Sequence, residues 1–211
     1  MTMLTPPVSG VELNAAQYIN ATSGNQEYFT PAFIIEAARL TMGSIDVDPA
    51  SCMAANRIVQ ASTIYTKHMN GLKLTWRGNV WFNPPFGKEE KPCQPNCTKK
   101  VCKKRGHCIT EVSPGMKSWV DKLVLEFHRG NTKQACAITY ACTSEKWFRP
   151  LQRYWQCYLY PRTNYLGEDG KPVRGVTKGS VVTYLGPNWR GFVDNFTPLG
   201  DVRPPLNHLA L

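Results

Sequence analysis

Apolar residues recur along the chain in patterns that predict helices and strands in alternation. After Thr30-Pro31, the side chains of Phe33, Ala37 and Leu40 fall on one face of a helix, with threonine as the expected N-cap and proline at the first helical position. Short apolar segments predict strands at residues 44–48, 79–82, 135–141, 156–160 and 180–185, and further helices are expected at 51–60, 114–130 and 144–154.

Two of the predicted strands end abruptly at proline, one at Asp48-Pro49 and the other at Asn83-Pro84. Proline donates no backbone hydrogen bond, so the chain must leave a central strand there. The alternation of strands and helices predicts an α/β sheet with helices on both faces, and such sheets bind ligands at the C-terminal ends of their strands. Both proline exits are therefore expected at one functional edge.

The length and composition favour one folded domain. The chain has 211 residues, 42% of them hydrophobic, which suits a single full core. Residues 1–25 are expected to be flexible, the domain to cover 26–200 with a Cys- and Lys-rich insertion at 88–113, and the Pro-rich tail from Thr197, including 201–211, to be irregular. No apolar run reaches the roughly 18 residues that span a bilayer, and the first residues predict no secretory leader. The expected location is the cytoplasm, that of a host cell if the chain is phage-encoded.

The charge balance points to a polyanionic partner. The chain has 25 Lys and Arg against 15 Asp and Glu, a formal net charge of +10. Nucleic acid is the commonest partner of such proteins, and a basic protein without one is the alternative. Part of the charge lies in the insertion, where we expect contacts with DNA phosphates from Lys99, Lys100, Lys103, Lys104 and Arg105. A merely solvated charged surface is the alternative interpretation of this cluster.

The insertion also holds half of the chain's eight cysteines, at Cys93, Cys97, Cys102 and Cys108. Short spacings of this kind suit tetrahedral zinc, with His107 as an alternate fourth ligand, and a set of free surface thiols is the other possibility. A polar segment with few apolar residues gains most from a metal staple. The remaining cysteines, predicted to be ordinary core residues, are Cys52, Cys136, Cys142 and Cys157.

The segment Asn83-Pro84-Pro85-Phe86 carries the strongest chemical signal. An exocyclic amine conjugated with its ring is a poor nucleophile, so a catalyst must hold its hydrogens and aim its lone pair. The Asn83 side-chain oxygen and the Pro84 carbonyl can accept those hydrogens, prolines stiffen the loop, and Phe86 offers a face on which an extruded base can stack. Asn-Pro-Pro also occurs in ordinary turns, so the segment alone does not decide the function.

Three landmarks in order and spacing give the chain a resemblance over about residues 26–200. They are Glu27-Tyr28-Phe29-Thr30-Pro31, Asp46-Val47-Asp48-Pro49-Ala50-Ser51 and Gly78-Asn79-Val80-Trp81-Phe82-Asn83-Pro84-Pro85-Phe86-Gly87, with weaker matches at Asn70-Gly71-Leu72 and Trp147-Phe148. In these features the chain resembles the phage-type (Dam-like) DNA N6-adenine methyltransferase family. The resemblance implies a compact, Rossmann-like class I S-adenosylmethionine-dependent methyltransferase fold with a Cys-rich insertion, acting on adenine in DNA.

The resemblance also implies a set of cofactor-binding positions. Thr30 and Pro31, with Phe29 beside them, are expected near the methionine end of S-adenosylmethionine, and the segment Asp48-Pro49-Ala50-Ser51 replaces the usual glycine-rich loop. No Gly-x-Gly follows the first strand, and the short spacing from Pro49 to the next landmark strand leaves too few residues for the usual two intervening strands. The acidic residue that should hold the ribose is not identified, and the sheet is expected to be truncated there.

Other functions remain open at this stage. Similar loops serve enzymes that methylate RNA adenine, cytosine N4 or glutamine amides, and a zinc-stabilised nucleic-acid-binding protein without catalysis is a further alternative. Pro92-Cys93-Gln94 reproduces a cytosine-C5 methyltransferase motif, but no accompanying Glu-Asn-Val occurs in the chain. No separate target-recognition domain is evident, so specificity is expected to come from the insertion and from short loops.

Overall fold

The computed structural model describes residues 29–167, 170–173 and 177–206. The segment predicted to be flexible, 1–25, lies outside these ranges, as do Glu27, Tyr28 and the last part of the predicted tail, 207–211. The elements in chain order are α2 (Ala32–Met42), β1 (Val47–Asp48), α3 (Met53–Val59), β2 (Thr63–Ile64), η1 (Gly71–Lys73), β3 (Gly78–Phe82), α4 (Lys100–Arg105), α5 (Met116–His128), β4 (Thr132–Tyr140), η2 (Arg149–Arg153), β5 (Trp155–Leu159), β6 (Ser180–Leu185), α6 (Trp189–Phe196), η3 (Thr197–Leu199) and β7 (Gly200–Arg203).

The architecture is a mixed α/β fold built on a seven-stranded sheet in the order β2-β1-β3-β4-β6-β5-β7. Strands β2, β1, β3 and β4 are parallel to one another, whereas β4 with β6, β6 with β5, and β5 with β7 pair antiparallel. From β1 the chain first builds β2 on one side and then crosses to β3 on the other, so the strand order reverses between β1 and β3. Such a reversal opens a crevice at the carboxyl ends of the two strands.

Asp46 fixes the pairing of β1 with β3. Its backbone N–H donates to the Asn79 carbonyl at 2.8 Å, and its Oδ2 accepts from the Asn79 N–H at 2.8 Å. Gly78 precedes this contact with φ +86°, and a Cβ there would lie 2.2 Å from Asp46 Oδ2. Only glycine fits both the left-handed backbone and the close approach.

Helices cover both faces of the sheet, as predicted. Buried side chains of α2, α3 and α6 form one apolar cluster with Trp81, Cys136 and Tyr184 of the strands. Buried side chains of α5 form the second cluster with strand residues such as Phe82 and with the 3-10 helix η2. Trp147 and Phe148 join this second cluster, which agrees with the core role that a Trp-Phe pair most often has.

Several predicted elements needed correction. In α2, Phe33 and Leu40 are 57% and 63% exposed, and the buried face carries Ile34, Ile35 and Ala38 instead. The helix predicted over 144–154 is a turn followed by the short η2, because Pro150 cannot supply the N–H that a continuous α-helix needs. The tail predicted to be irregular from Thr197 holds η3 and the edge strand β7.

Four further elements had no counterpart in the prediction: β2, η1, α4 and α6. For α6 a local signal exists, because the Asn188 side chain caps the helix by accepting from the Gly191 N–H at 3.2 Å. The expected truncation of the sheet is seen, since the single strand β2 lies between β1 and β3 in sequence.

Candidate functional site

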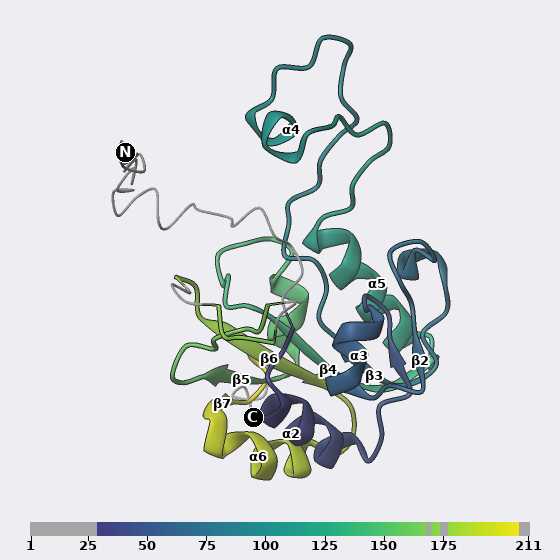
Figure 1. Ribbon diagram of the computed structural model, residues 1–211. Coiled ribbons are helices and arrows are strands. Elements are labelled where there is room, and N and C mark those ends of the chain that lie inside the picture. Colours follow the sequence, from purple (N-terminus) through teal and green to yellow (C-terminus); the bar gives the residue numbers. More distant parts are fainter. Residues whose placement is uncertain (1–28, 168–169, 174–176, 207–211) are drawn as a thin grey trace, which may run out of the picture.

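Asp48 and Asn83 lie at the C-terminal ends of neighbouring parallel strands, where the strand order reverses. Val47 of β1 pairs with Val80 of β3, so Asp48 ends β1 beside the strand that Asn83 follows directly. The prediction that both proline exits share one edge is therefore confirmed. The C-terminal ends of β1, β2, β3 and β4 all point toward the end of the molecule from which the segment 88–113 rises (Figure 1).

Asp48 is a buried carboxyl group without a cationic partner among the described residues. Its side chain is 2% exposed and accepts a hydrogen bond from the Ala50 N–H at 3.2 Å. Burial raises its pKa to about 7, although the nearby Ser51 hydroxyl and the Ala50 N–H act in the opposite direction. A buried carboxylate of this kind is stabilised by any ligand that brings a positive charge to it.

Two hydroxyl groups among the predicted cofactor residues are buried without a hydrogen-bond partner. Thr30 is 3% exposed and Ser51 9%, and neither Oγ atom makes a hydrogen bond; Ser51 lies near Asp48 but not in bonding geometry. Thr30 was predicted to cap α2, yet Pro31 occupies the N-cap position and no side chain caps the helix. Buried polar atoms are nearly always satisfied, so each of these two hydroxyls is a position where a water molecule or a ligand can complete the bonding.

Gly71 supports the loop that follows Asp48. A Cβ on Gly71 would lie 2.0 Å from the Pro49 carbonyl oxygen, and the Gly71 carbonyl accepts from Trp76 Nε1 at 2.8 Å. The weak sequence match at Asn70-Gly71-Leu72 thus corresponds to a backbone contact that holds the Pro49 loop in place.

The loop after β3 places its four residues in different environments. Asn83 is half-buried, Pro84 is buried and Pro85 is exposed. The half-buried Phe86 ring packs against Tyr140, with ring centroids 4.4 Å apart, and against Tyr165 at 5.9 Å.

Tyr140, Tyr165 and Lys178 are residues at this edge that the sequence analysis missed. Tyr140 ends β4, beside β3, and the Lys178 ammonium lies 5.1 Å from the centre of its ring. Tyr165 is 2% exposed, and its hydroxyl shares a hydrogen bond of 2.9 Å with Ser180. Tyr140 could have been found, because it lies at the C-terminal end of a predicted strand; Tyr165 and Lys178 lie in loops with no such signal.

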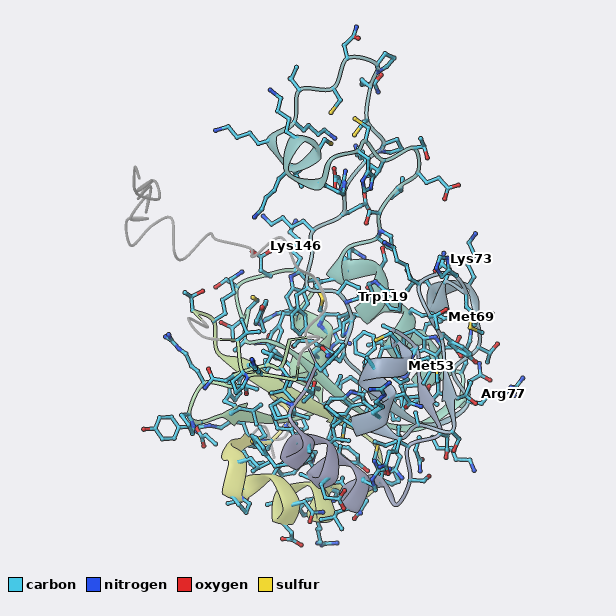
Figure 2. All side chains as sticks on the ribbon, in the orientation of Figure 1. Met53, Met69, Lys73, Arg77, Trp119 and Lys146 are labelled. Atoms are coloured by element: carbon cyan, nitrogen blue, oxygen red, sulfur yellow. The ribbon has the colours of Figure 1, made fainter. Side chains whose placement is uncertain are left out.

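The segment 88–113, hereafter the arm, stands away from the body of the molecule on two strand-like segments (Figure 1). Glu90 and Ser113 exchange two backbone hydrogen bonds of 2.9 Å, and at the base the Met116 N–H donates to the Gly87 carbonyl at 3.1 Å. Within the arm only Cys102 is buried, and no arm residue joins either apolar cluster. Side chains crowd the interior of the body but project outward along the arm (Figure 2).

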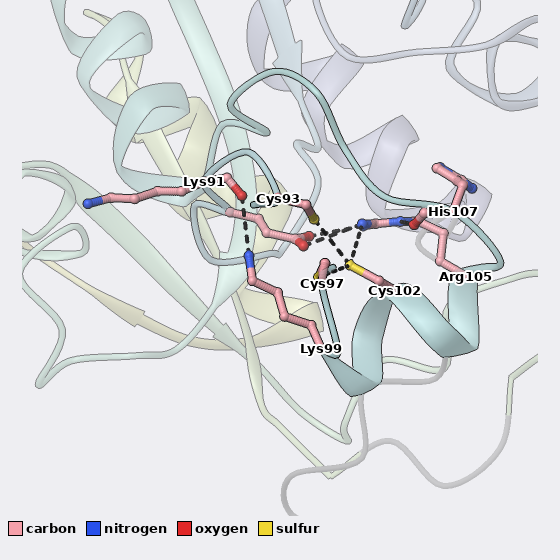
Figure 3. A network of polar contacts seen from close by, with 8 residues as sticks. Lys91, Cys93, Cys97, Lys99, Cys102, Arg105 and His107 are labelled. Atoms are coloured by element: carbon pink, nitrogen blue, oxygen red, sulfur yellow. Dashed lines mark hydrogen bonds and ion pairs between the residues drawn. The ribbon is translucent and has the colours of Figure 1, made fainter. Parts of the chain in front are cut away.

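At the tip of the arm, Cys93, Cys97, Cys102 and Cys108 bring their sulfur atoms within 4.8 Å of one another. Cys102 Sγ lies 3.3 Å from Cys93 Sγ and 3.6 Å from Cys97 Sγ (Figure 3). All four cysteines are free thiols. Four sulfurs around a zinc ion at about 2.3 Å would lie roughly 3.8 Å apart, so the cluster is compatible with a tetrathiolate metal site. Cys108 therefore completes the set, and the alternate ligand His107 is not part of it.

The thiols are hydrogen-bonded to one another, and these bonds shift their pKa values. The hydrogen bond from Cys102 is the main reason that the pKa of Cys93 falls to about 7, and the same bond raises the pKa of Cys102 to about 12. A bound metal ion would displace the thiol protons, because its charge stabilises all four cysteines as thiolates. The Pro92-Cys93-Gln94 cysteine thus lies within the cluster.

Arg105 differs from the four lysines with which it was predicted to bind DNA. Its Nη1 lies 2.9 Å from Glu90 Oε2, its Nη2 donates to Cys102 Sγ at 3.5 Å, and its Nε donates to the His107 carbonyl at 3.2 Å. The ion pair lowers the pKa of Glu90. Figure 3 shows the guanidinium group directed into the arm, toward the cysteines. All four lysines, Lys99, Lys100, Lys103 and Lys104, are exposed.

Two surface hollows lie away from the Asp48–Asn83 edge. One, of about 480 Å³, lies between α2 and α3 and is lined by residues including Phe33, Glu36, Arg39 and Arg57. The other, of about 330 Å³, lies at the opposite side of the sheet and is lined by residues including Gln156 and Arg203. Neither Asp48 nor Asn83 lines either hollow.

No helix in the described ranges is long and apolar enough to cross a membrane. Comparison with known proteins gives no match to a family model, to a curated protein or to a solved structure.

Proposed function

We propose that the chain is an S-adenosylmethionine-dependent methyltransferase that methylates the N6 amine of adenine in DNA. The observation that carries the proposal is the placement of Asp48 and Asn83 at the C-terminal ends of two neighbouring parallel strands, where the strand order reverses. That position is the usual ligand crevice of an open α/β sheet. The resemblance to the phage-type N6-adenine methyltransferases supports the choice of reaction.

We assign the sheet to the Rossmann-like class I methyltransferase fold in a compact form. Four parallel strands with helices on both faces support this assignment, as does the crossover from β2 to β3. The single short strand β2 agrees with the absence of residues for a longer sheet on that side. The missing ribose-binding acid is consistent with the same truncation.

The residues around Asp48 suit the cofactor's amino-acid end. When bound, S-adenosylmethionine supplies a methyl group on a positively charged sulfur. Asp48 would hold its ammonium group, and the hydroxyls of Thr30 and Ser51 would gain the partners they lack. Because Asp48 is 2% exposed, this contact requires the segment after it, Pro49 to Ser51, to open as the ligand enters.

Asn83 and Pro84 would hold the target amine. The Asn83 amide oxygen and the Pro84 carbonyl accept the two N–H groups, which leaves the nitrogen lone pair directed at the methyl carbon. A new N–C bond forms as the S–C bond breaks, and the nitrogen then releases one proton to water, since neither acceptor is basic enough to keep it. The aromatic pair Phe86 and Tyr140 would receive the extruded base by stacking, which offsets the few kcal/mol that extrusion costs.

We further propose that the four thiolates of Cys93, Cys97, Cys102 and Cys108 hold one zinc ion with a structural role. The closed set of four sulfur ligands leaves no open coordination position, which is typical of structural rather than catalytic zinc. The arm has no apolar core of its own that could hold it folded in place of a metal ion.

The test is incubation of the purified chain with labelled S-adenosylmethionine and mixed-sequence DNA, followed by mass spectrometry of the nucleosides. We expect N6-methyladenine, and we expect Asn83→Ala to lose methyl transfer while calorimetry shows that it still binds the cofactor. Asn164→Ala, at an exposed asparagine, is the matched control. Label on cytosine, RNA or protein would redirect the proposal to another amine, and absence of cofactor binding would leave a nucleic-acid-binding protein without catalysis.

A further inference from the structure

The charged residues of the arm fall into two groups that behave differently. Residues 88–113 include seven Lys or Arg and three acidic residues, a net charge of +4. Lys99, Lys100, Lys103 and Lys104 are exposed, whereas Arg105 is bonded inside the arm to Glu90 and Cys102. The arm therefore has a basic outer surface formed by the lysines, and a separate cation, Arg105, that is bonded inside the arm.

We propose that the arm is a metal-assembled clamp for the phosphate backbone of DNA. In this clamp Arg105 joins the cysteine cluster at the tip to the stalk, which is the pair of segments joined through Glu90 and Ser113, and the four lysines make the contacts. The proposal rests on the proposed function only for the choice of DNA as the polyanion.

The helix α4 is the first support for the clamp. It has six residues, Lys100–Arg105, which is too short to be stable in isolation. Its lysines stand four residues apart, Lys99 with Lys103 and Lys100 with Lys104, and like charges at this spacing repel one another. The helix forms here around one buried side chain, Cys102, which belongs to the metal cluster. Metal binding thus holds together a surface whose charges oppose its folding, and a polyanion relieves that repulsion.

The contacts of Arg105 are the second support. Its guanidinium group reaches Cys102 at the tip and Glu90 in the stalk, where Glu90 also pairs with Ser113 through the backbone. One side chain therefore connects the cysteine cluster to the two paired segments through which the arm joins the body. Arg105 is a positioning residue, and it orients the lysines without contacting the DNA itself.

The location of the arm is the third support. The arm begins at residue 88, a few residues after Asn83, and rises from the same end of the sheet (Figure 1). Lys73 and Lys146, both exposed, lie at the end of the body that faces the arm (Figure 2). A nucleic-acid backbone across this end would touch the arm while one base reaches the Asn83 loop.

The experiment measures binding of a fluorescent DNA duplex to the full chain over a range of salt concentrations, together with zinc content by mass spectrometry. Removing a phosphate contact lowers the slope of log affinity against log salt by about 0.9. We expect Lys103→Ala/Lys104→Ala to keep one zinc per chain, to weaken binding about tenfold and to lower the slope by about 1.8. The control, Arg77→Ala/Lys133→Ala, removes two exposed charges at the starts of β3 and β4, the opposite edge of the sheet, and should leave the slope unchanged.

Two further variants distinguish the effects of the metal ion and of Arg105 from those of the phosphate contacts. Cys97→Ser/Cys102→Ser should lose zinc and most of the arm's contribution to the slope, while cofactor binding by calorimetry persists. Arg105→Ala should weaken binding with an unchanged slope. If Arg105→Ala lowers the slope by about 0.9, the residue contacts phosphate and the connecting role is wrong. If the lysine pair behaves like its control, or the zinc-free chain binds as before, the clamp is refuted, whether or not the chain methylates DNA.

Discussion

The body of the molecule and its arm reach their structures by different means. The body covers both faces of a sheet with apolar clusters in which Trp81, Phe82, Phe192 and Leu123 are fully buried. The arm buries a single side chain, Cys102, and is otherwise held by backbone pairs, one ion pair and four converging thiols. Hydrophobic burial grows with the number of residues that surround a core, so a segment of this size cannot stabilise itself in that way. The comparison indicates that the two regions should respond to different perturbations.

Loss of a thiol should have the largest effect, and it should be confined to the arm. We expect Cys102→Ser to reduce the zinc content from one ion per chain to nearly none and to make residues 88–113 the first site of cleavage by a protease, because the proposed zinc ion would supply most of the arm's folding free energy. Zinc analysis and limited proteolysis measure both effects. Cys52→Ser is the control, since Cys52 only caps α3 through a hydrogen bond from the Ala55 N–H, a role that serine fills well. Equal protease sensitivity of the two variants would contradict the prediction.

A cavity created in the body should have the opposite effect: it should destabilise the body and leave the arm unchanged. Leu123 lies on α5, shortly after the arm, and is 0% exposed in the second apolar cluster. Leu123→Ala should lower the free energy of unfolding by about 2–5 kcal/mol and leave the zinc content unchanged. Urea denaturation followed by tryptophan fluorescence measures the effect. Leu125→Ala, on the same helix but 43% exposed, should cost far less, and loss of zinc from Leu123→Ala would show that the regions are coupled.

The buried carboxyl group at the strand edge should make cofactor binding depend on pH. Because burial raises the pKa of Asp48 to about 7, the ligand-free chain keeps this group protonated at lower pH, and an ammonium group binds only the ionised form. Affinity should fall by up to tenfold per pH unit below pH 7 and level off above it. Calorimetry from pH 5.5 to 7.5 measures this, with Asp48→Asn flattening the profile and the exposed Asp194→Asn leaving it intact. A wild-type profile without this slope would remove Asp48 from the site.

The same raised pKa has a consequence for stability. From about pH 4 to pH 7 the unfolded carboxyl is ionised while the folded one holds its proton, so the contribution of Asp48 to the free energy of unfolding decreases as the pH rises.

The smallest effect should come from the ion pair between Arg105 and Glu90. Both side chains are partly exposed, at 26% and 22%, so solvent screens the pair and its contribution to stability is small. Glu90→Gln should weaken zinc binding by no more than about fivefold, because Arg105 keeps its bonds to Cys102 and His107. Competition with a chromophoric chelator measures the change. A large loss of zinc affinity would mean that the pair, and not the metal, holds the tip together.

The sequence predicted best those features that depend on short-range pattern. The apolar face of α5 follows from its spacing, the proline exits from the missing N–H, and the four-cysteine cluster from the spacing of the cysteines. Features that depend on distant neighbours were not accessible. The buried face of α2 is set by packing against α6 and the sheet, which exposes Phe33 despite its apolar side chain.

The same limit applies to the candidate site. That Asp48 and Asn83 share an edge follows from general rules for parallel sheets, but the unpartnered hydroxyl of Thr30 and the ring contact between Phe86 and Tyr140 do not. Arg105 shows the limit most clearly: in the sequence it is one of a run of basic residues, and only three-dimensional proximity to Glu90 and Cys102 distinguishes it.

The hydrogen bond between Gly87 and Met116 has a consequence for how the chain could be altered. The Met116 nitrogen lies 3.1 Å from the Gly87 carbonyl oxygen, so the chain leaves the body and returns to it at nearly the same point. The arm therefore does not lengthen the connection that β3 and α5 need. A tight turn of a few residues would bridge the same gap, and a different finger-like module with equally close ends could be grafted there. The arm and the Asn83 loop are thus separable units, open to exchange one at a time.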